Sequence, residues 1–143
     1  GDSKSQFGYC IHIGRSGANI VKGKTATTIP HSPCEAEIKA MDEVTREVVW
    51  LRGLMVEIGL EQTEPTVVYS DSLAGINQLS AYKNSSKARH YCRDLNYLRQ
   101  MIDEGVVRFE HIAGDENRSD ALTKNLGYEK FSRFARLLMR GEI

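Results

Sequence analysis

The sequence predicts a mixed α/β fold in which a β-sheet is covered by helices. Three observations support this class. Alternating apolar residues near the start indicate a β-hairpin, a long amphipathic helix follows, and two short β-type runs then alternate with further helices. A chain of 143 residues can bury its own hydrophobic core, so we expect one domain over residues 1–143.

The composition excludes several classes of protein. Lys plus Arg and Asp plus Glu number 19 each, so overall charge gives no argument for a nucleic-acid or membrane partner. The three cysteines are far apart in the sequence and form no Cys-x-x-Cys pair, which argues against a disulfide framework and a zinc site. No apolar run is long enough to span a membrane. We therefore expect an intracellular protein without a membrane partner, in a compartment that the sequence does not specify.

The first strands form a predicted hairpin. Large apolar side chains alternate over residues 7–13, and a strand-like pattern resumes over 18–24 after a turn at 14–17. Residues 25–29 extend or follow the second strand, and Pro30 ends it.

The next element is a helix expected from Ser32 to Ile58. Ser32 is a favoured N-cap, Pro33 suits the first turn, and Glu35 stands three residues after the cap, as in a capping box. Trp50 lies opposite the apolar stripe, so it either meets another helix or is exposed. The stripe comprises Ile38, Met41, Val44, Val48, Leu51, Met55 and Ile58.

The second half of the chain alternates strands and helices. The expected elements are a strand over 65–71, a helix over 72–82, a loop over 83–87, a helix over 88–104, a strand over 106–112, a polar loop over 113–117, a short helix from Ser119 and a last helix over 128–140 with an apolar docking face.

Two carboxylates stand at element ends on the expected core side. Asp71 ends the strand over 65–71, at the sheet edge where ligands bind in open α/β sheets, although an N-cap for the following helix is an alternative role. With Met41 at zero, Glu37 lies at about −40° on the apolar face, whereas Glu35 lies at about +120° and points away. A carboxylate on a buried face needs a partner, a hydrogen bond or a metal, unless the first turn lets it reach water.

Asp120 is a third candidate, at the start of the short helix after Ser119. Alone it is consistent with an acid that favours a helix N-terminus. Together, Glu37, Asp71 and Asp120 stand at termini that such a sheet brings together, and converging carboxylates suit Mg²⁺ or Mn²⁺.

Several motifs resemble one known family in their order and spacing. They are Ser32–Ala40 with its S-x-x-E-A-E start, Trp50–Arg52, Tyr69–Ser72 and Ser119–Lys124. They resemble the ribonuclease H domain of copia-type retrotransposon polyproteins, over about residues 7–140. The resemblance implies a ribonuclease H-like mixed β-sheet flanked by helices, and hydrolysis of the RNA strand of an RNA–DNA hybrid. It also implies two Mg²⁺ ions held by four carboxylates, of which Glu37, Asp71 and Asp120 match three.

The chain departs from this family at its start. In the family, a first strand carrying the fourth acid precedes the strand that matches residues 7–13. Only residues 1–6 stand there, and Asp2 matches a turn rather than the strand. Three explanations are open: a piece of a longer polyprotein, a partner that supplies the strand, or a domesticated descendant that no longer cleaves. We expect another chain or segment to supply the missing strand, because unpaired strand edges leave the core open.

Basic and polar residues near Asp71 are candidate contacts for the hybrid. Lys83, Lys87, Arg89, His90 and Arg93 follow the Asp71 helix and suit phosphates, although a solvated charged face explains them equally well. Ser70, Ser72 and Asn77 flank Asp71 and suit the nucleic-acid backbone or the 2′-hydroxyls. His111 is interpreted as a strand residue. Two functions therefore remain: metal-dependent cleavage of a hybrid, or a non-catalytic module for nucleic-acid binding or assembly.

Overall fold

The computed structural model describes residues 6–14, 20–25, 29–81, 89–117 and 127–140, and it confirms a mixed α/β fold. The chain divides into two compact units, one formed by His31–Ile112 and the other by Gly1–Pro30 together with Ala113–Ile143. The described strands pair as two separate two-stranded sheets, one in each unit.

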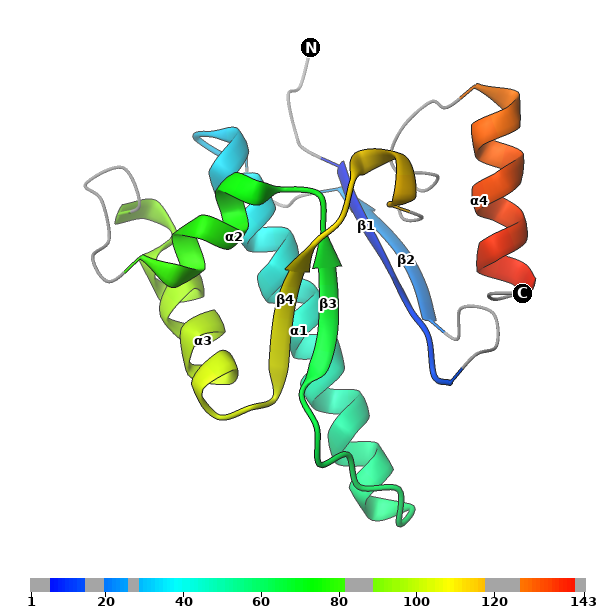
Figure 1. The fold of residues 1–143 in the computed structure, drawn as a ribbon. Helices are drawn as coiled ribbons and strands as arrows, with labels where there is room; N and C mark the ends of the chain where they lie inside the picture. Colours follow the sequence, from blue (N-terminus) through cyan, green and yellow to red (C-terminus); the bar gives the residue numbers. More distant parts are fainter. Residues whose placement is uncertain (1–5, 15–19, 26–28, 82–88, 118–126, 141–143) are drawn as a thin grey trace. The chain divides into compact units, whose positions relative to one another are not determined.

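The unit His31–Ile112 contains a parallel strand pair packed against helices. Strands β3 and β4 run side by side, with Thr66 opposite Val107 and Ser70 opposite His111. Helix α1 passes behind the two strands in Figure 1, and α3 lies beside β4. The elements of this unit are α1 (Pro33–Glu57), β3 (Thr66–Ser70), α2 (Leu73–Ser80), α3 (Cys92–Asp103) and β4 (Val107–His111).

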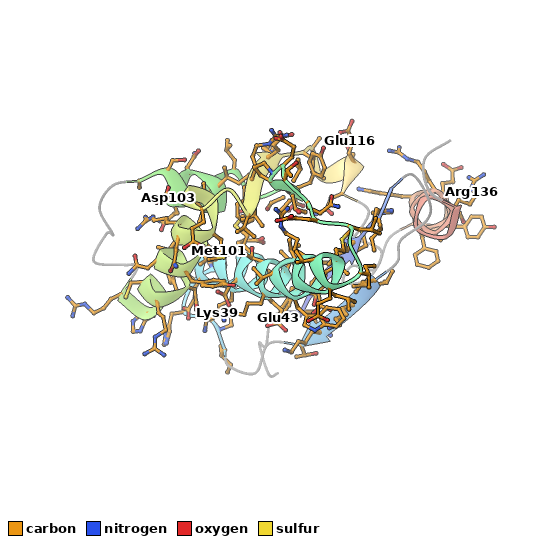
Figure 2. The ribbon with its side chains drawn as sticks, turned by 90° about the horizontal axis from the view of Figure 1, so that it is seen from below. Lys39, Glu43, Met101, Asp103, Glu116 and Arg136 are labelled. Carbon is orange, nitrogen blue, oxygen red and sulfur yellow. The ribbon has the colours of Figure 1, made fainter. Side chains whose placement is uncertain are left out.

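The core of this unit lies between α1, α2 and α3. Figure 2 shows α1 and α3 side by side, with Lys39 and Glu43 on α1 and Met101 and Asp103 on α3. Phe109 of β4 packs against this core, which joins the strand pair to the helices. The buried cluster comprises Ile38, Met41, Leu79, Tyr91, Leu95 and Leu98.

The predicted stripe of α1 is confirmed as fully buried only at some positions up to Val48. Ile38, Met41 and Val48 are buried, but Ile58 is 63% exposed, so its predicted burial is wrong. Figure 1 shows the reason: the C-terminal part of α1 extends past the strands of its unit. Trp50 is 60% exposed, which settles the choice left open for that side chain.

Helix ends and one arginine fix how the elements of this unit connect. Gly59 and Gly105, which follow the ends of α1 and α3, have φ values of +80° and +71°, in the left-handed conformation that glycine favours. Helix α3 begins at Cys92 rather than at residue 88. The Arg52 guanidinium donates to the carbonyls of Gln62 and Glu64 at 2.7 and 2.8 Å, which holds the connection before β3 against α1.

The other unit contains the predicted hairpin and the last helix. Strands β1 (Gln6–Ile11) and β2 (Ile20–Thr25) are antiparallel, as expected. Helix α4 (Tyr128–Arg140) has the predicted bounds, and a 3₁₀ turn, η2 (Gly114–Glu116), lies in the predicted polar loop. The Lys130 ammonium bonds to Asp115 at 2.8 Å and lowers the pKa of that carboxyl. Residues 118–126, with the helix expected from Ser119, lie outside the described part of the chain. None of the described helices is long and apolar enough to cross a membrane.

Candidate functional site

Asp71 occupies the short connection between the end of β3 and the start of α2. The N-cap of α2 is Ser72, whose hydroxyl oxygen accepts from the Gly75 backbone N–H at 3.1 Å. The alternative role of Asp71 as the N-cap is therefore wrong. The Ser70 carbonyl accepts from the Ile112 N–H at 2.9 Å, and the Ser70 hydroxyl oxygen accepts from the Ser72 N–H at 3.1 Å. Both neighbours of the half-buried Asp71 are thus held in place.

Glu37 lies on the face of α1 that meets the first turn of α2. Gly75 is buried there, and a Cβ added to it would stand 3.6 Å from the Glu37 Cβ and 3.0 Å from the Met41 Cε. The absence of a side chain at Gly75 lets α2 approach α1 closely, four residues after Asp71 in sequence. Glu37 and Asp71 are both half-buried: Glu37 lies near the start of α1, Asp71 directly precedes the N-cap of α2, and the two helices are in contact.

The prediction that Glu35 points away from the core is wrong, because its side chain is only 2% exposed. The Glu35 N–H donates to the Ser32 hydroxyl at 3.1 Å, which confirms Ser32 as the cap. The Glu35 carboxylate accepts from the His31 N–H at 2.6 Å and pairs with the Lys39 ammonium at 2.9 Å. The carboxylate therefore bonds to the residue before the cap, which an angle measured around the helix axis does not describe.

The pKa of Glu35 reflects opposing effects. Burial favours the neutral acid, but the hydrogen bonds from Lys39 and His31, together with their charges, outweigh it and lower the pKa below the ordinary 4.5. A carboxyl whose pKa is lowered by folding stabilises the protein above the unfolded value, and this contribution is lost as the pH falls through the folded value.

We expect Glu35→Ala to lower the free energy of unfolding by roughly 1–3 kcal/mol at neutral pH, because it removes the carboxylate that accepts from the His31 N–H and pairs with Lys39. The difference from wild type should shrink as the pH falls below 4.5, where the unfolded state already binds the proton. Urea unfolding followed by circular dichroism at a series of pH values measures both effects. A difference that does not change with pH would contradict the assigned role.

The remaining predicted contacts divide into described and undescribed residues. Asn77, Arg89 and His90 are exposed in the same unit as Asp71. His111 ends β4, as the strand interpretation expects. Lys83, Lys87 and Asp120 lie outside the described residues, so their placement stays a prediction.

The sequence did not lead us to predict a role for His31, which contacts His90, one of the predicted substrate contacts. The ring of His31, in the segment leading into α1, stacks on the ring of His90, with centroids 4.3 Å apart and planes 27° apart. No local pattern relates the two, since the contact depends on how α1 and α3 pack. The sequence offers one indication of this contact, which is that each histidine belongs to a segment already discussed. His31 precedes the helix cap at Ser32, and His90 lies in the basic run that ends at Arg93.

The two predicted carboxylates that the structure describes are of the type that binds a hard cation. Glu37 and Asp71 offer carboxylate oxygens, the ligands that Mg²⁺ and Mn²⁺ prefer. Within the described ranges no three His, Cys, Asp or Glu side chains converge in a way that could hold a metal ion. The third predicted carboxylate, Asp120, is outside those ranges.

Comparison with known proteins relates this α/β chain to retroelements. The chain is 26% identical over 134 residues to the retrovirus-related Pol polyprotein from transposon RE1 of Arabidopsis thaliana, with 94% of the chain covered. It is 25% identical over 135 residues to the corresponding polyprotein from transposon RE2, again with 94% covered. It is 31% identical over 128 residues to the polyprotein from transposon TNT 1-94 of Nicotiana tabacum, with 90% covered.

These relatives are much longer than the chain, which spans 9–10% of their length. No protein-family model and no solved structure matches the chain. The similarity places the chain among the relatives of copia-type retrotransposon Pol polyproteins, as the sequence motifs indicated.

Proposed function

We propose that the chain is a ribonuclease H-like domain of retroelement origin that hydrolyses the RNA strand of RNA–DNA hybrids. The observation that carries this proposal is the arrangement of Glu37 and Asp71. Each is half-buried, and the first turn of α2, which follows Asp71, packs against the face of α1 that holds Glu37. Similarity to retrotransposon Pol polyproteins supports the proposal, since it covers both residues.

In this proposal Glu37, Asp71 and Asp120 hold two Mg²⁺ ions. Ions bound there would activate the attacking water and stabilise the leaving 3′ oxygen during in-line displacement. The chain's own residues hold the carboxylates in position. The Ser70 and Ser72 hydrogen bonds fix the backbone on both sides of Asp71, and Gly75 keeps α2 against α1. Positioning of this kind contributes strongly to catalysis, because small displacements of reacting groups are costly.

Contacts with the hybrid are proposed for residues around this pair. Ser70 and Ser72 use their hydroxyl oxygens as acceptors within the fold, so each hydroxyl hydrogen is left to donate to a phosphate or a 2′-oxygen. Asn77, Lys87, Arg89 and His90 complete the proposed contact set, in which the cationic side chains would bind the phosphate backbone.

A further polypeptide strand is also part of the proposal. The two described sheets contain two strands each, and a two-stranded sheet is marginally stable by itself. A parallel pair such as β3 and β4 is normally found in a larger, covered sheet. A segment or chain that pairs beside these strands would extend the sheet and supply the fourth carboxylate expected from the family.

The test is a cleavage assay on an RNA–DNA hybrid, with each strand labelled in turn. We expect Mg²⁺-dependent cleavage of the RNA strand, giving 5′-phosphate and 3′-hydroxyl ends, with duplex DNA left intact. The chain is assayed alone and together with a segment that would supply the expected further strand. Binding of the hybrid without cleavage in both forms would overturn the catalytic proposal and favour the non-catalytic binding module.

A further inference from the structure

We infer that His31 and His90 together form a stacking site for a nucleobase, which would make His31 a substrate contact in addition to the set proposed above. The two rings come from segments far apart in the chain and stack with centroids 4.3 Å apart. Both residues are exposed on the unit that holds Glu37 and Asp71.

The backbone beneath each ring is fixed by buried neighbours. The His31 N–H donates to the buried Glu35 carboxylate at 2.6 Å. The residue after His90 is Tyr91, which is 3% exposed, and its hydroxyl donates to the Gln78 side-chain carbonyl at 3.4 Å. The pair is thus an exposed aromatic surface on a rigid base, and a rigid surface loses little entropy when a ligand binds.

The charges around the pair favour a nucleic-acid strand as the ligand. Arg89 and Arg93 are exposed on either side of His90 in sequence. The carboxylate of Glu35 is already neutralised by the Lys39 ammonium at 2.9 Å. Aromatic rings with cations beside them are the combination that binds single nucleic-acid strands, in which bases stack and phosphates pair with Arg or Lys.

The alternative of a metal ion held by the two imidazoles is disfavoured by the ring geometry. The planes lie only 27° apart, so the rings face each other instead of directing two nitrogens at one point. The described residues also supply no third His, Cys, Asp or Glu that would converge with them on a metal.

The position of the pair relates it to the proposed cleavage site. His31 stands six residues before Glu37. Glu37 lies roughly 6 Å along α1 from Pro33, where the helix begins, and His31 precedes that start by two residues. We place the base that stacks on the pair in the strand bound at Glu37 and Asp71. This placement rests on the proposed function, whereas binding by the pair does not require cleavage.

The test measures equilibrium binding of a fluorescent RNA–DNA hybrid with a short single-stranded overhang, in EDTA so that cleavage cannot occur. We expect His31→Ala and His90→Ala each to weaken binding by about fivefold or more. The double variant should lose less than the product of the two single losses, because both remove one shared surface. His31→Phe keeps an aromatic ring and should restore most of the binding.

Controls separate stacking from folding. His31→Ala retains the backbone N–H that bonds Glu35, so its melting temperature should match wild type. Trp50→Ala removes an aromatic side chain that is 60% exposed on α1, and it should leave binding unchanged. A 2-aminopurine placed in the overhang should change its fluorescence on binding wild type but not the double variant.

The outcomes distinguish this inference from the proposed function. Binding that is unchanged in His31→Ala and His90→Ala, or lost equally in Trp50→Ala, overturns the stacking site whether or not the protein cleaves. If the alanine variants weaken binding and His31→Phe restores it, the stacking site is supported even if no cleavage is found.

Discussion

Glu37→Gln and Asp71→Asn are each expected to lower the rate of hybrid cleavage by about a thousandfold. Loss of a carboxylate that holds a catalytic metal removes several kcal/mol of transition-state stabilisation, and each 1.36 kcal/mol is a factor of ten in rate. Both substitutions preserve the shape of the side chain and replace its negatively charged carboxylate by a neutral amide. Single-turnover cleavage at saturating Mg²⁺ measures the chemical step directly.

Glu35→Gln is the matched control for Glu37→Gln, because the two glutamates stand two residues apart on the same helix turn. Glu35 bonds to the His31 N–H and to Lys39 within the fold, so its substitution should lower stability and leave the cleavage rate of the folded protein nearly unchanged. The opposite result, with cleavage lost in Glu35→Gln and kept in Glu37→Gln, would mean that the wrong glutamate has been assigned to the site.

Features set by neighbouring residues were predictable from the sequence. The start of α1 follows from Ser32 and Pro33, and the ends of α1 and α3 follow from glycines that favour the left-handed conformation. The hairpin follows from the alternation and from the turn residues between the two runs. Each of these depends on a few adjacent residues, so packing of distant elements did not alter it.

Features that depend on distant elements were not predictable. Burial of Ile58 would require a strand or helix beside the last turns of α1, and within its own unit the strands do not reach that far. The stacking of His31 on His90 depends on the packing of α1 against α3. The stripe gives the face of a helix that is apolar, but the length of the neighbouring elements decides how much of that face is covered.

In the candidate site, too, local features were predictable from the sequence and features that depend on packing were not. Asp71 could be assigned to the end of a strand, but only the structure shows that Ser72, and not Asp71, is the N-cap of α2. Glu37 could be assigned to the core face of α1 from its angle, and Gly75 explains why α2 comes close to it. The angle failed for Glu35 because a side chain in the first turn can fold back over residues before the helix.

Leu98→Ala is expected to lower the free energy of unfolding by about 2–5 kcal/mol, the range for truncating a leucine in a core that cannot collapse around the cavity. Leu98 of α3 is fully buried in the cluster between the three helices. Leu54→Ala is the matched control, because Leu54 is 41% exposed near the C-terminal end of α1. Its substitution should change stability by about 0.5 kcal/mol or less, since alanine also has the higher helix propensity.

Urea unfolding followed by far-ultraviolet circular dichroism measures both variants in one experiment. A large loss in Leu98→Ala beside a small one in Leu54→Ala would show that the stability of His31–Ile112 comes from the packing of α1, α2 and α3. Equal losses would contradict the exposure of α1 beyond the strands, because they would require a contact on Leu54 as extensive as the one on Leu98. That comparison therefore tests the helix packing on which the placement of Glu37 beside α2 depends.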